Sequence, residues 1–257
     1  MAIYLLKKSY QLNDLSEVGF KDLWGDHGIF TTMWIFGKPP KILFFENHIK
    51  NLIRSLQNYG VKKNSLRKNI LKIINTNLSK KITYNHLLRV AVNKEIISIS
   101  LRKRVVPKLN FNLKLINLKR ENPKFKNLKY KKILSHLSKM DNSKSDIGLI
   151  YNKKILETGT SNLLFTKNKK VFAPIKDHYE GNTYKFFKSK IKKIIKKDIL
   201  LKEINDYDEI LLLGSGKGVA SVRTINEIKW RRKNLEKFRL LSKHYNTVIN
   251  KCNSYKF

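Results

Sequence analysis

The sequence predicts an α/β protein of two lobes, and three of its features support that expectation. Short runs of β-branched and aromatic residues alternate with longer runs whose apolar residues recur at helical spacing. A polar, turn-prone stretch at 119–126, which contains Pro123, divides the chain near its middle. Hydrophobic residues form 41% of the 257 residues, which is enough for one large core or two small ones. We therefore expect a first lobe at 1–118, a linker at 119–126 and a second lobe at 127–257.

The first lobe is expected to contain a β-hairpin followed by two helices. Residues 29–36 are rich in β-branched and aromatic side chains, and a turn from Gly37 to Pro40 separates them from a partner strand at 41–45. Apolar residues recur every three or four positions over 46–59 and over 65–78, which predicts amphipathic helices. The remaining strands expected in this lobe cover 86–92, 96–101 and 111–118.

The second lobe is expected to mix strands and helices. Its lysine-rich stretch at 183–196 has apolar residues at helical spacing, which predicts an amphipathic helix with the lysines of 188–197 on its solvated face. The other expected helices cover 130–140 and 234–250. The expected strands are 147–151, 162–166, 170–173, 199–204, 209–213 and 219–223.

The chain is strongly basic, with a formal net charge of +36 from 55 lysines and arginines against 19 acidic residues. Such a charge is compatible with a nucleic-acid partner, because basic surfaces bind phosphate backbones. The lysines, however, are spread along the whole chain, and no zinc-finger, helix-turn-helix or RNA-binding motif accompanies them. Biased composition therefore explains the charge better, and a nucleic-acid partner is not expected.

Other features of the composition bear on location and metals. The single cysteine, Cys252, excludes a disulfide within the chain and fits a reducing compartment. No stretch of about 18 apolar residues is present, so we expect no membrane span and a cytoplasmic protein. The six histidines lack the spacing of metal ligands, so no metal site is expected.

A lysine, a carboxylate and a helix start occur in an order that suits one cofactor. Lys129 lies in Asn127-Leu128-Lys129-Tyr130, Glu157 opens Glu157-Thr158-Gly159-Thr160-Ser161-Asn162, and Gly181-Asn182-Thr183 precedes a helical run. A lysine amine bonds covalently to the aldehyde of pyridoxal phosphate, and a carboxylate pairs with its ring nitrogen. A helix N-terminus stabilises its phosphate, because unpaired amides and the helix dipole point there.

These segments, with others, make the sequence resemble the fold-type IV (class IV) pyridoxal-phosphate enzymes. That family includes 4-amino-4-deoxychorismate lyase, branched-chain aminotransferases and D-amino acid aminotransferases. The similar stretches are 25–32, 45–55, 128–129, 157–163, 180–184 and 208–222, and the Glu157 segment is the most specific of them. The resemblance implies a two-lobe, D-amino acid aminotransferase-like fold of mixed sheets with flanking helices.

The resemblance also implies a site that binds pyridoxal 5'-phosphate and a small-molecule amine, in a homodimer. Lys129 would be the catalytic residue, and Glu157 would face the ring nitrogen. Phosphate contacts would come from Gly181, Asn182, Thr183, Ser215 and Gly216. Phe30 and Thr32 lie on one face of a strand and would line the substrate pocket.

Two positions depart from the family pattern. The family helix carries a phosphate-binding arginine where this chain has Asn51, and asparagine supplies neither the charge nor the bidentate fork. Arg54 lies one turn further along the same helix face and is the candidate replacement. The alternatives are phosphate binding by backbone amides alone or loss of the cofactor. At the second position, Tyr184 stands where the family has arginine or glutamine.

The preferred activity is that of 4-amino-4-deoxychorismate lyase, which releases pyruvate and 4-aminobenzoate for folate synthesis. The short chain and the segment Phe30-Thr31-Thr32 favour it over a branched-chain or D-amino acid aminotransferase, which is the alternative. Two weaker alternatives are a basic nucleic-acid-binding protein and a family member without cofactor.

Overall fold

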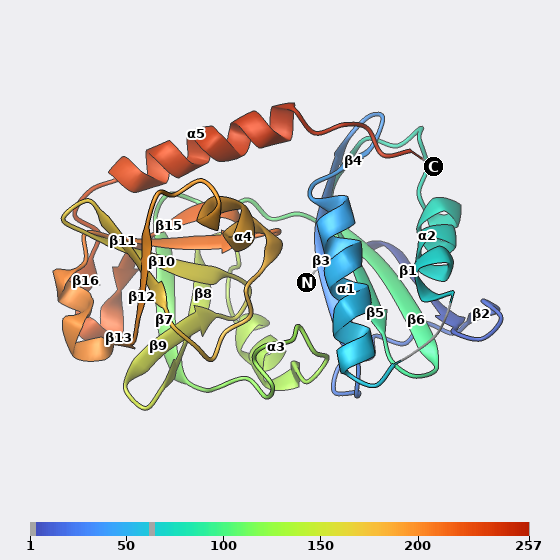
Figure 1. The fold of residues 1–257 in the computed structure, drawn as a ribbon, viewed down its shortest axis with the longest axis horizontal. Helices are drawn as coiled ribbons and strands as arrows, with labels where there is room; N and C mark the ends of the chain where they lie inside the picture. Colours follow the sequence, from blue (N-terminus) through green and yellow to red (C-terminus); the bar gives the residue numbers. More distant parts are fainter. Residues whose placement is uncertain (1–3, 62–64, 257) are drawn as a thin grey trace. The chain divides into compact units, whose positions relative to one another are not determined.

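The computed structural model describes residues 4–61 and 65–256, and these form two compact units (Figure 1). The first unit contains Met1–Arg104, Phe125–Lys131 and Lys251–Phe257, and the second contains Val105–Lys124 and Lys132–Asn250. This division differs from the expected boundaries, because residues 105–118, expected in the first lobe, group with the second unit, whereas Phe125–Lys131 group with the first. Two short segments group with the first unit because Asn127 pairs with Ile29 and Ser254 pairs with Lys41.

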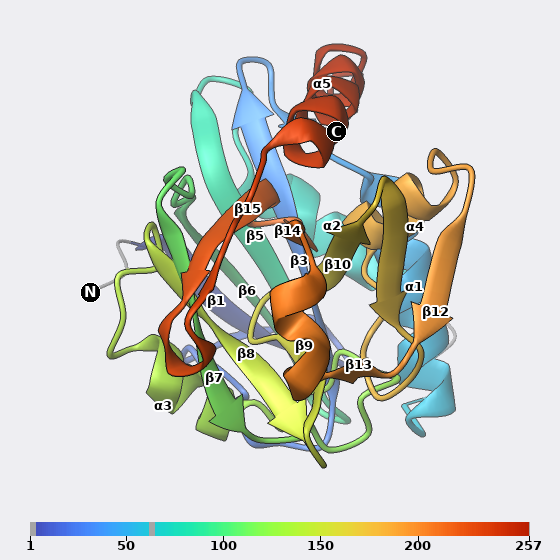
Figure 2. The same ribbon diagram turned by 90° about the vertical axis from the view of Figure 1, so that its left-hand side faces the viewer.

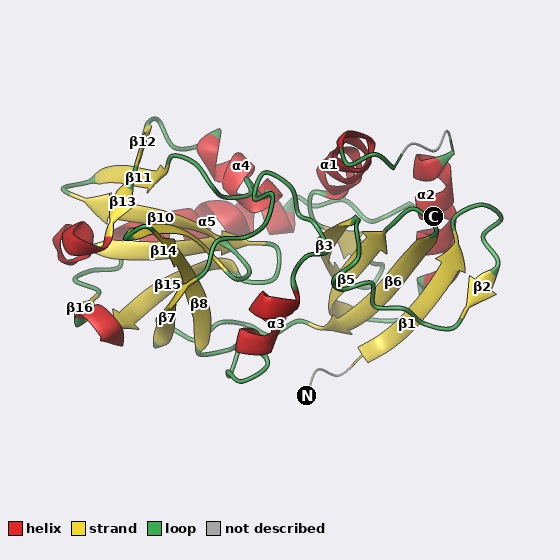
Figure 3. Cartoon of the chain, turned by 90° about the horizontal axis from the view of Figure 1, so that it is seen from below, coloured by secondary structure: helices red, strands yellow, loops and turns green. Residues whose placement is uncertain are grey.

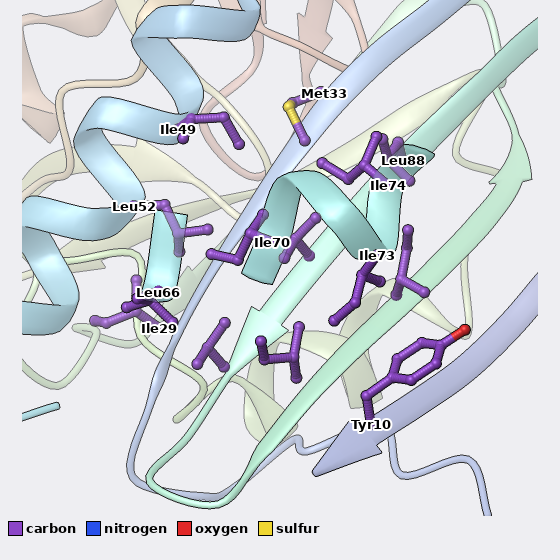
Figure 4. Close-up of a cluster of buried hydrophobic side chains, with 14 of the residues drawn as sticks. Tyr10, Ile29, Met33, Ile49, Leu52, Leu66, Ile70, Ile73, Ile74 and Leu88 are labelled. Atoms are coloured by element: carbon purple, nitrogen blue, oxygen red, sulfur yellow. The ribbon is translucent and has the colours of Figure 1, made fainter. Parts of the chain in front are cut away.

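The first unit is an antiparallel sheet of six strands in the order β2-β1-β6-β5-β3-β4. Its strands are β1 (Tyr4–Gln11), β2 (Glu17–Val18), β3 (Ile29–Gly37), β4 (Lys41–Ile42), β5 (Tyr84–Val92) and β6 (Ile96–Lys103). Two helices, α1 (Phe45–Asn58) and α2 (Leu66–Asn77), cover one face of this sheet (Figure 3). The apolar stripes of both helices supply buried side chains to one core, including Ile49, Leu52, Ile70 and Ile74 (Figure 4).

The second unit is a mixed sheet of ten strands in the order β12-β11-β10-β14-β15-β7-β8-β9-β13, with β16 paired to β15 (Figure 2). Its strands are β7 (Phe111–Asn117), β8 (Ser145–Tyr151), β9 (Lys154–Thr158), β10 (Asn162–Lys167), β11 (Lys170–Pro174), β12 (Ile194–Lys197), β13 (Ile199–Leu200), β14 (Glu209–Gly214), β15 (Gly218–Ile225) and β16 (Trp230–Arg231). Its helical segments are α3 (Lys131–Leu137, whose first residue belongs to the other unit), α4 (Asn182–Lys188), α5 (Glu236–Asn250) and the 3₁₀ turns at Leu201–Asp206 and Asn226–Ile228.

Most expected elements are present, and three differ. The helix expected at 183–196 ends at Lys188, and Ile194 to Lys197 instead form β12, which pairs in parallel with β11. The strand expected at 41–45 is short because Phe44 adopts a left-handed φ of 56° and α1 begins at Phe45. The strand expected at 199–204 stops at Leu200 and continues as a 3₁₀ turn. The lysines of 188–197 therefore do not share one helix face.

Candidate active site

Lys129 follows a short extended segment that lies beside β3 in the first unit. Leu128 N donates to Gly28 O at 2.9 Å, and Phe30 N donates to Lys126 O at 2.9 Å. The side chain of Lys129 is exposed to solvent in this single chain, and its Nζ donates a hydrogen bond to Gly25 O at 2.8 Å. Backbone pairing with the start of β3 thus fixes the position of the predicted catalytic lysine.

The turn from Gly25 to Gly28 requires glycine at both ends. Gly25 has a φ of +94°, and a Cβ there would lie 2.6 Å from Cε of Lys131. A Cβ on Gly28 would lie 2.3 Å from Val92 O and 2.7 Å from Cδ1 of Leu128. The close approach of the Lys129 segment therefore depends on these two glycines.

Three aromatic rings, which we call the aromatic wall, gather next to this segment: Trp24, Phe30 and Tyr130. The Phe30 ring centroid lies 4.8 Å from that of Trp24 and 5.4 Å from that of Tyr130. The Arg89 guanidinium lies 3.9 Å over the Trp24 ring and donates to Asp22 O. Burial lowers the pKa of Arg89 to about 10. Phe30 thus packs in the wall, and Thr32 pairs with Arg89 across β3 and β5.

Helix α1 carries Asn51, which stands where the family pattern has a phosphate-binding arginine, and Arg54, its predicted replacement. Arg54 is exposed, and its Nη2 donates to Asn51 Oδ1 at 3.3 Å. The two side chains therefore meet on one face of the helix, as the spacing predicts. His48, one turn before Asn51, is buried and hydrogen-bonded through Nδ1 to Thr31 Oγ1 at 2.7 Å.

Glu157 is buried in the second unit, where β9 pairs with β8. The register shifts there, because Leu149 pairs with Glu157 while Ile150 pairs with Ile155. Such a bulge re-aims the side chains beside it. The Glu157 carboxylate accepts two hydrogen bonds: Oε1 accepts one from Arg120 Nε at 2.6 Å, and Oε2 accepts one from Tyr179 N at 3.4 Å.

The turn after Glu157 is held from inside by Asp146. Oδ2 of this fully buried aspartate accepts the hydroxyls of Thr158 at 2.8 Å and Thr160 at 2.7 Å. Thr158 Oγ1 in turn accepts Ser161 N at 2.8 Å. A Cβ on Gly159 would lie 2.8 Å from the Ile147 side chain, so the motif needs glycine there.

The segment Gly181-Asn182-Thr183 forms the start of α4, as expected. The first of its amides is already engaged, because Gly181 N donates to Asn162 Oδ1 at 2.9 Å. Oγ1 of Thr183, however, is buried and has no hydrogen-bond partner among the residues that the structure describes. A buried hydroxyl at a helix start fits an anion such as phosphate, which would satisfy it.

Tyr184, which replaces the family arginine or glutamine, turns into the second unit. It is almost fully buried, and burial raises its pKa to about 12, with Glu180 adding to the shift. Its hydroxyl has no partner in the described part of the chain. Tyr184 therefore provides no positive charge and little access to solvent.

Ser215 and Gly216 lie in the tight turn between β14 and β15. Gly214 pairs with Gly218, and Gly218 has a φ of +69° that closes the hairpin. Lys217, which follows Gly216, is almost buried, with its Nζ 3.6 Å from Asp146 Oδ2. Asp146 thus contacts both the turn after Glu157 and the turn that holds Ser215 and Gly216.

The predicted residues fall into two sets, one in each unit. Lys129, Phe30, Thr32 and Arg54 belong to the first unit. Glu157, Gly181, Asn182, Thr183, Ser215 and Gly216 belong to the second. Sequence reasoning missed Arg120, Asp146, Trp24 and Tyr130. Asp146 could have been noticed only because acidic residues are scarce in this chain, which has 19 of them. Arg120 could not have been noticed in the same way, because it is one of 55 lysines and arginines.

The second unit also has a cavity that is separate from the predicted site residues. A cavity of about 270 Å³ in the second unit is lined by Lys167, Asn168, Lys170, Phe172, Lys197, Glu203, Asp206 and Tyr207. It contains none of the predicted site residues, and two of its lysines pair with its acids, Lys167 with Asp206 and Lys197 with Glu203. Within 4–61 and 65–256, no three potential metal ligands cluster, and no helix is long and apolar enough to cross a bilayer.

Solved structures of similar fold include several aminotransferases. A branched-chain aminotransferase from Thermoproteus uzoniensis with norvaline has a TM-score of 0.78 and 13% identity, over 98% of this chain and 96% of that one. A candidate 4-amino-4-deoxychorismate lyase from Legionella pneumophila has a TM-score of 0.69 and 19% identity, over 86% and 91%. A hypothetical aminotransferase from Mycobacterium tuberculosis in its PLP-bound form has a TM-score of 0.67 and 12% identity, over 96% and 99%.

No curated protein matches the sequence. A family model described as amino-transferase class IV matches residues 28–225, which include every predicted site residue. The match confirms the resemblance inferred from the motifs, and the mixed α/β architecture agrees with it. The chain therefore belongs to the class IV aminotransferase family and is a pyridoxal-phosphate-dependent enzyme.

Proposed function

We propose that this enzyme is a 4-amino-4-deoxychorismate lyase, which releases pyruvate and leaves 4-aminobenzoate for folate synthesis. The observation that supports it most is the aromatic wall of Trp24, Phe30 and Tyr130 beside Lys129. Phe30 and Tyr130 are buried within the wall, and the partly exposed ring of Trp24 is the part of it on which a flat cyclic substrate can stack. The charged groups of Arg89 and Lys126 lie against Trp24 and Phe30, which puts positive charge beside the wall, where it would attract substrate carboxylates.

The residues present fit the cofactor. Lys129 would hold it covalently, and Glu157 would bind its ring nitrogen. The unsatisfied hydroxyl of Thr183, together with Asn182, Ser215 and Gly216, would bind its phosphate, and Arg54 would supply the positive charge that Asn51 cannot. When bound, pyridoxal phosphate withdraws electrons from the carbon that carries the substrate's amine.

The reaction then needs one well-placed base. Once the substrate's amine has displaced Lys129 from the cofactor, the freed Nζ of Lys129 would take the proton from the ring carbon that bears the amine. The C–O bond to the enolpyruvyl group breaks, the ring becomes aromatic, and the departing group takes up a proton to become pyruvate. The two products together contain every atom of the substrate, so no oxidant or reductant is required.

A class IV aminotransferase acting on branched-chain or D-amino acids is the second candidate. The high TM-score to the Thermoproteus uzoniensis enzyme favours it. In that reaction Lys129 would return the proton to a different carbon, and the amine would pass to a keto acid. We propose a cytoplasmic homodimer in either case, as the resemblance implies.

An assay of purified protein separates these functions. The protein should be yellow, and borohydride should fix the cofactor covalently to Lys129. Lys129→Ala should abolish this labelling, whereas Lys132→Ala, a change at a neighbouring exposed lysine, should not. Pyruvate release from 4-amino-4-deoxychorismate, without transfer from branched-chain or D-amino acids to 2-oxoglutarate, establishes the lyase.

Two other results would overturn the proposal. Amine transfer to 2-oxoglutarate without pyruvate release would assign the aminotransferase activity instead. A colourless protein that takes up no cofactor but binds DNA with a steep salt dependence would favour the basic-surface alternative.

A further inference from the structure

The ion pair between Arg120 and Glu157 is unusually buried for this chain. Arg120 Nε lies 2.6 Å from Glu157 Oε1, and the two side chains are 3% and 7% exposed. Most other ion pairs of the described residues are at least partly exposed, such as Lys154 with Asp198, at 32% and 40%. Burying two charges costs free energy that their attraction does not always recover, so such a pair calls for a reason.

Both partners are fixed by further contacts. Arg120 Nη2 donates to Pro123 O at 3.0 Å, which holds the guanidinium within its own loop. Glu157 Oε2 accepts the amide of Tyr179, and the bulge in β9 sets the direction of the side chain. A carboxylate has about four acceptor positions, so these two donors leave room for a third.

We propose that Arg120 is a positioning residue that orients the Glu157 carboxylate toward the ring nitrogen of the cofactor. This inference rests on the proposed role of Glu157. A charged hydrogen bond to Oε1 fixes the plane of the carboxylate, and the fork of the guanidinium allows a simultaneous bond to Pro123. Arg120 does not contact the reacting atoms in this arrangement and acts through Glu157.

Two substitutions test the role. Arg120→Met removes the charge, and Arg120→Lys keeps it but cannot reproduce both bonds in the same geometry. We expect the dissociation constant for pyridoxal phosphate to rise at least tenfold in Arg120→Met and less in Arg120→Lys. The absorbance band of the bound cofactor, and its dependence on pH, should shift in both variants, because the partner of the ring nitrogen is displaced.

A matched control separates positioning from stability. Lys154→Met removes a cation that lies 2.6 Å from Asp198 and whose residue belongs to the same strand as Glu157. It should leave the cofactor affinity and absorbance unchanged. Circular dichroism of the cofactor-free protein shows whether Arg120→Met folds. If it does not fold, Arg120→Lys alone tests the positioning role.

The outcomes distinguish this inference from the proposed function. If the unmodified protein binds no pyridoxal phosphate, the role of Glu157 fails and this inference fails with it. If it binds the cofactor, but the Arg120 variants keep its affinity within twofold and the same absorbance, Arg120 is only structural. A loss of thermal stability alone, with the cofactor band unmoved, would also overturn the positioning role.

Discussion

His48 shows how one buried side chain makes stability depend on pH. Burial, with a smaller contribution from the charge of Lys126, lowers the pKa of His48 to about 3, against 6.5 for an exposed histidine. The unfolded chain therefore binds a proton below about pH 6.5 that the folded chain does not bind until about pH 3. The contribution of His48 to the free energy of unfolding should therefore be fully present above about pH 6.5 and should be lost as the pH falls toward 3.

We predict that His48→Gln weakens this dependence, because an amide can bond Thr31 but does not titrate in this range. The unmodified protein should lose about 2 kcal/mol more than the variant between about pH 8 and pH 5. Urea denaturation at both pH values measures the difference. Parallel losses in the two proteins would show that other groups control the acid response.

Arg54 provides a second test at the scale of single residues. We predict that Arg54→Ala raises the dissociation constant for pyridoxal phosphate about tenfold, because a charged hydrogen bond to phosphate is lost. Asn51→Arg, which restores the family residue, should lower it. Fluorescence titration with the cofactor measures both.

Arg67, an exposed arginine of α2 paired with Glu46, offers the control. Its replacement by alanine should leave cofactor binding unchanged. If Arg54→Ala and Arg67→Ala lose the same affinity for pyridoxal phosphate, the effect is a general one of charge. If Arg54→Ala loses no affinity, binding of the phosphate by backbone amides alone is favoured.

The sequence supplied the predicted site residues, but not the residues that contact them in the fold. Lys129 and Glu157 could be singled out because their neighbours match a family pattern, although the chain has many other lysines. Arg120 lies in a stretch that looked like a linker, and only the fold brings it to Glu157. Contacts of this kind join distant parts of the chain and leave no local pattern.

At the scale of elements, local periodicity predicted most helices and strands but failed around α4. The apolar residues Ile194 and Ile195 are spaced as if in a helix, yet they pair with Val171 and Phe172 of β11. Sheet pairing supplies long-range hydrogen bonds that helical periodicity cannot reveal, and it outweighs a weak helix preference. Strands β5 and β6, by contrast, lie where the sequence predicted them, and the short polar turn between them marks where one ends and the next begins.

Asp146 allows a test of how two loops of the second unit depend on one another. We predict that Asp146→Asn lowers the free energy of unfolding by about 3–5 kcal/mol, because it leaves Lys217 buried without its counter-charge. Adding Lys217→Met should recover part of that loss. Denaturant unfolding of the two single variants and the double variant measures the coupling. Strictly additive losses would contradict a direct interaction between these side chains.

At the scale of the whole molecule, the net charge of +36 should oppose compactness. We predict that the melting temperature rises as sodium chloride increases from about 0.05 M to about 0.5 M, because salt screens the repulsion among lysines. Differential scanning calorimetry measures this shift. A melting temperature that falls with salt would show that attractive ion pairs outweigh the repulsion.

Strand β12 suggests a use for part of that charge. It forms the border of the ten-stranded sheet, where a strand from another molecule could otherwise add on. Lys196 and Lys197 lie on this border and pair with Glu180 and Glu203. Charged side chains on an edge strand disfavour pairing with the edge strand of a second molecule. The lysines of β12 can therefore protect this enzyme from aggregation at high protein concentration.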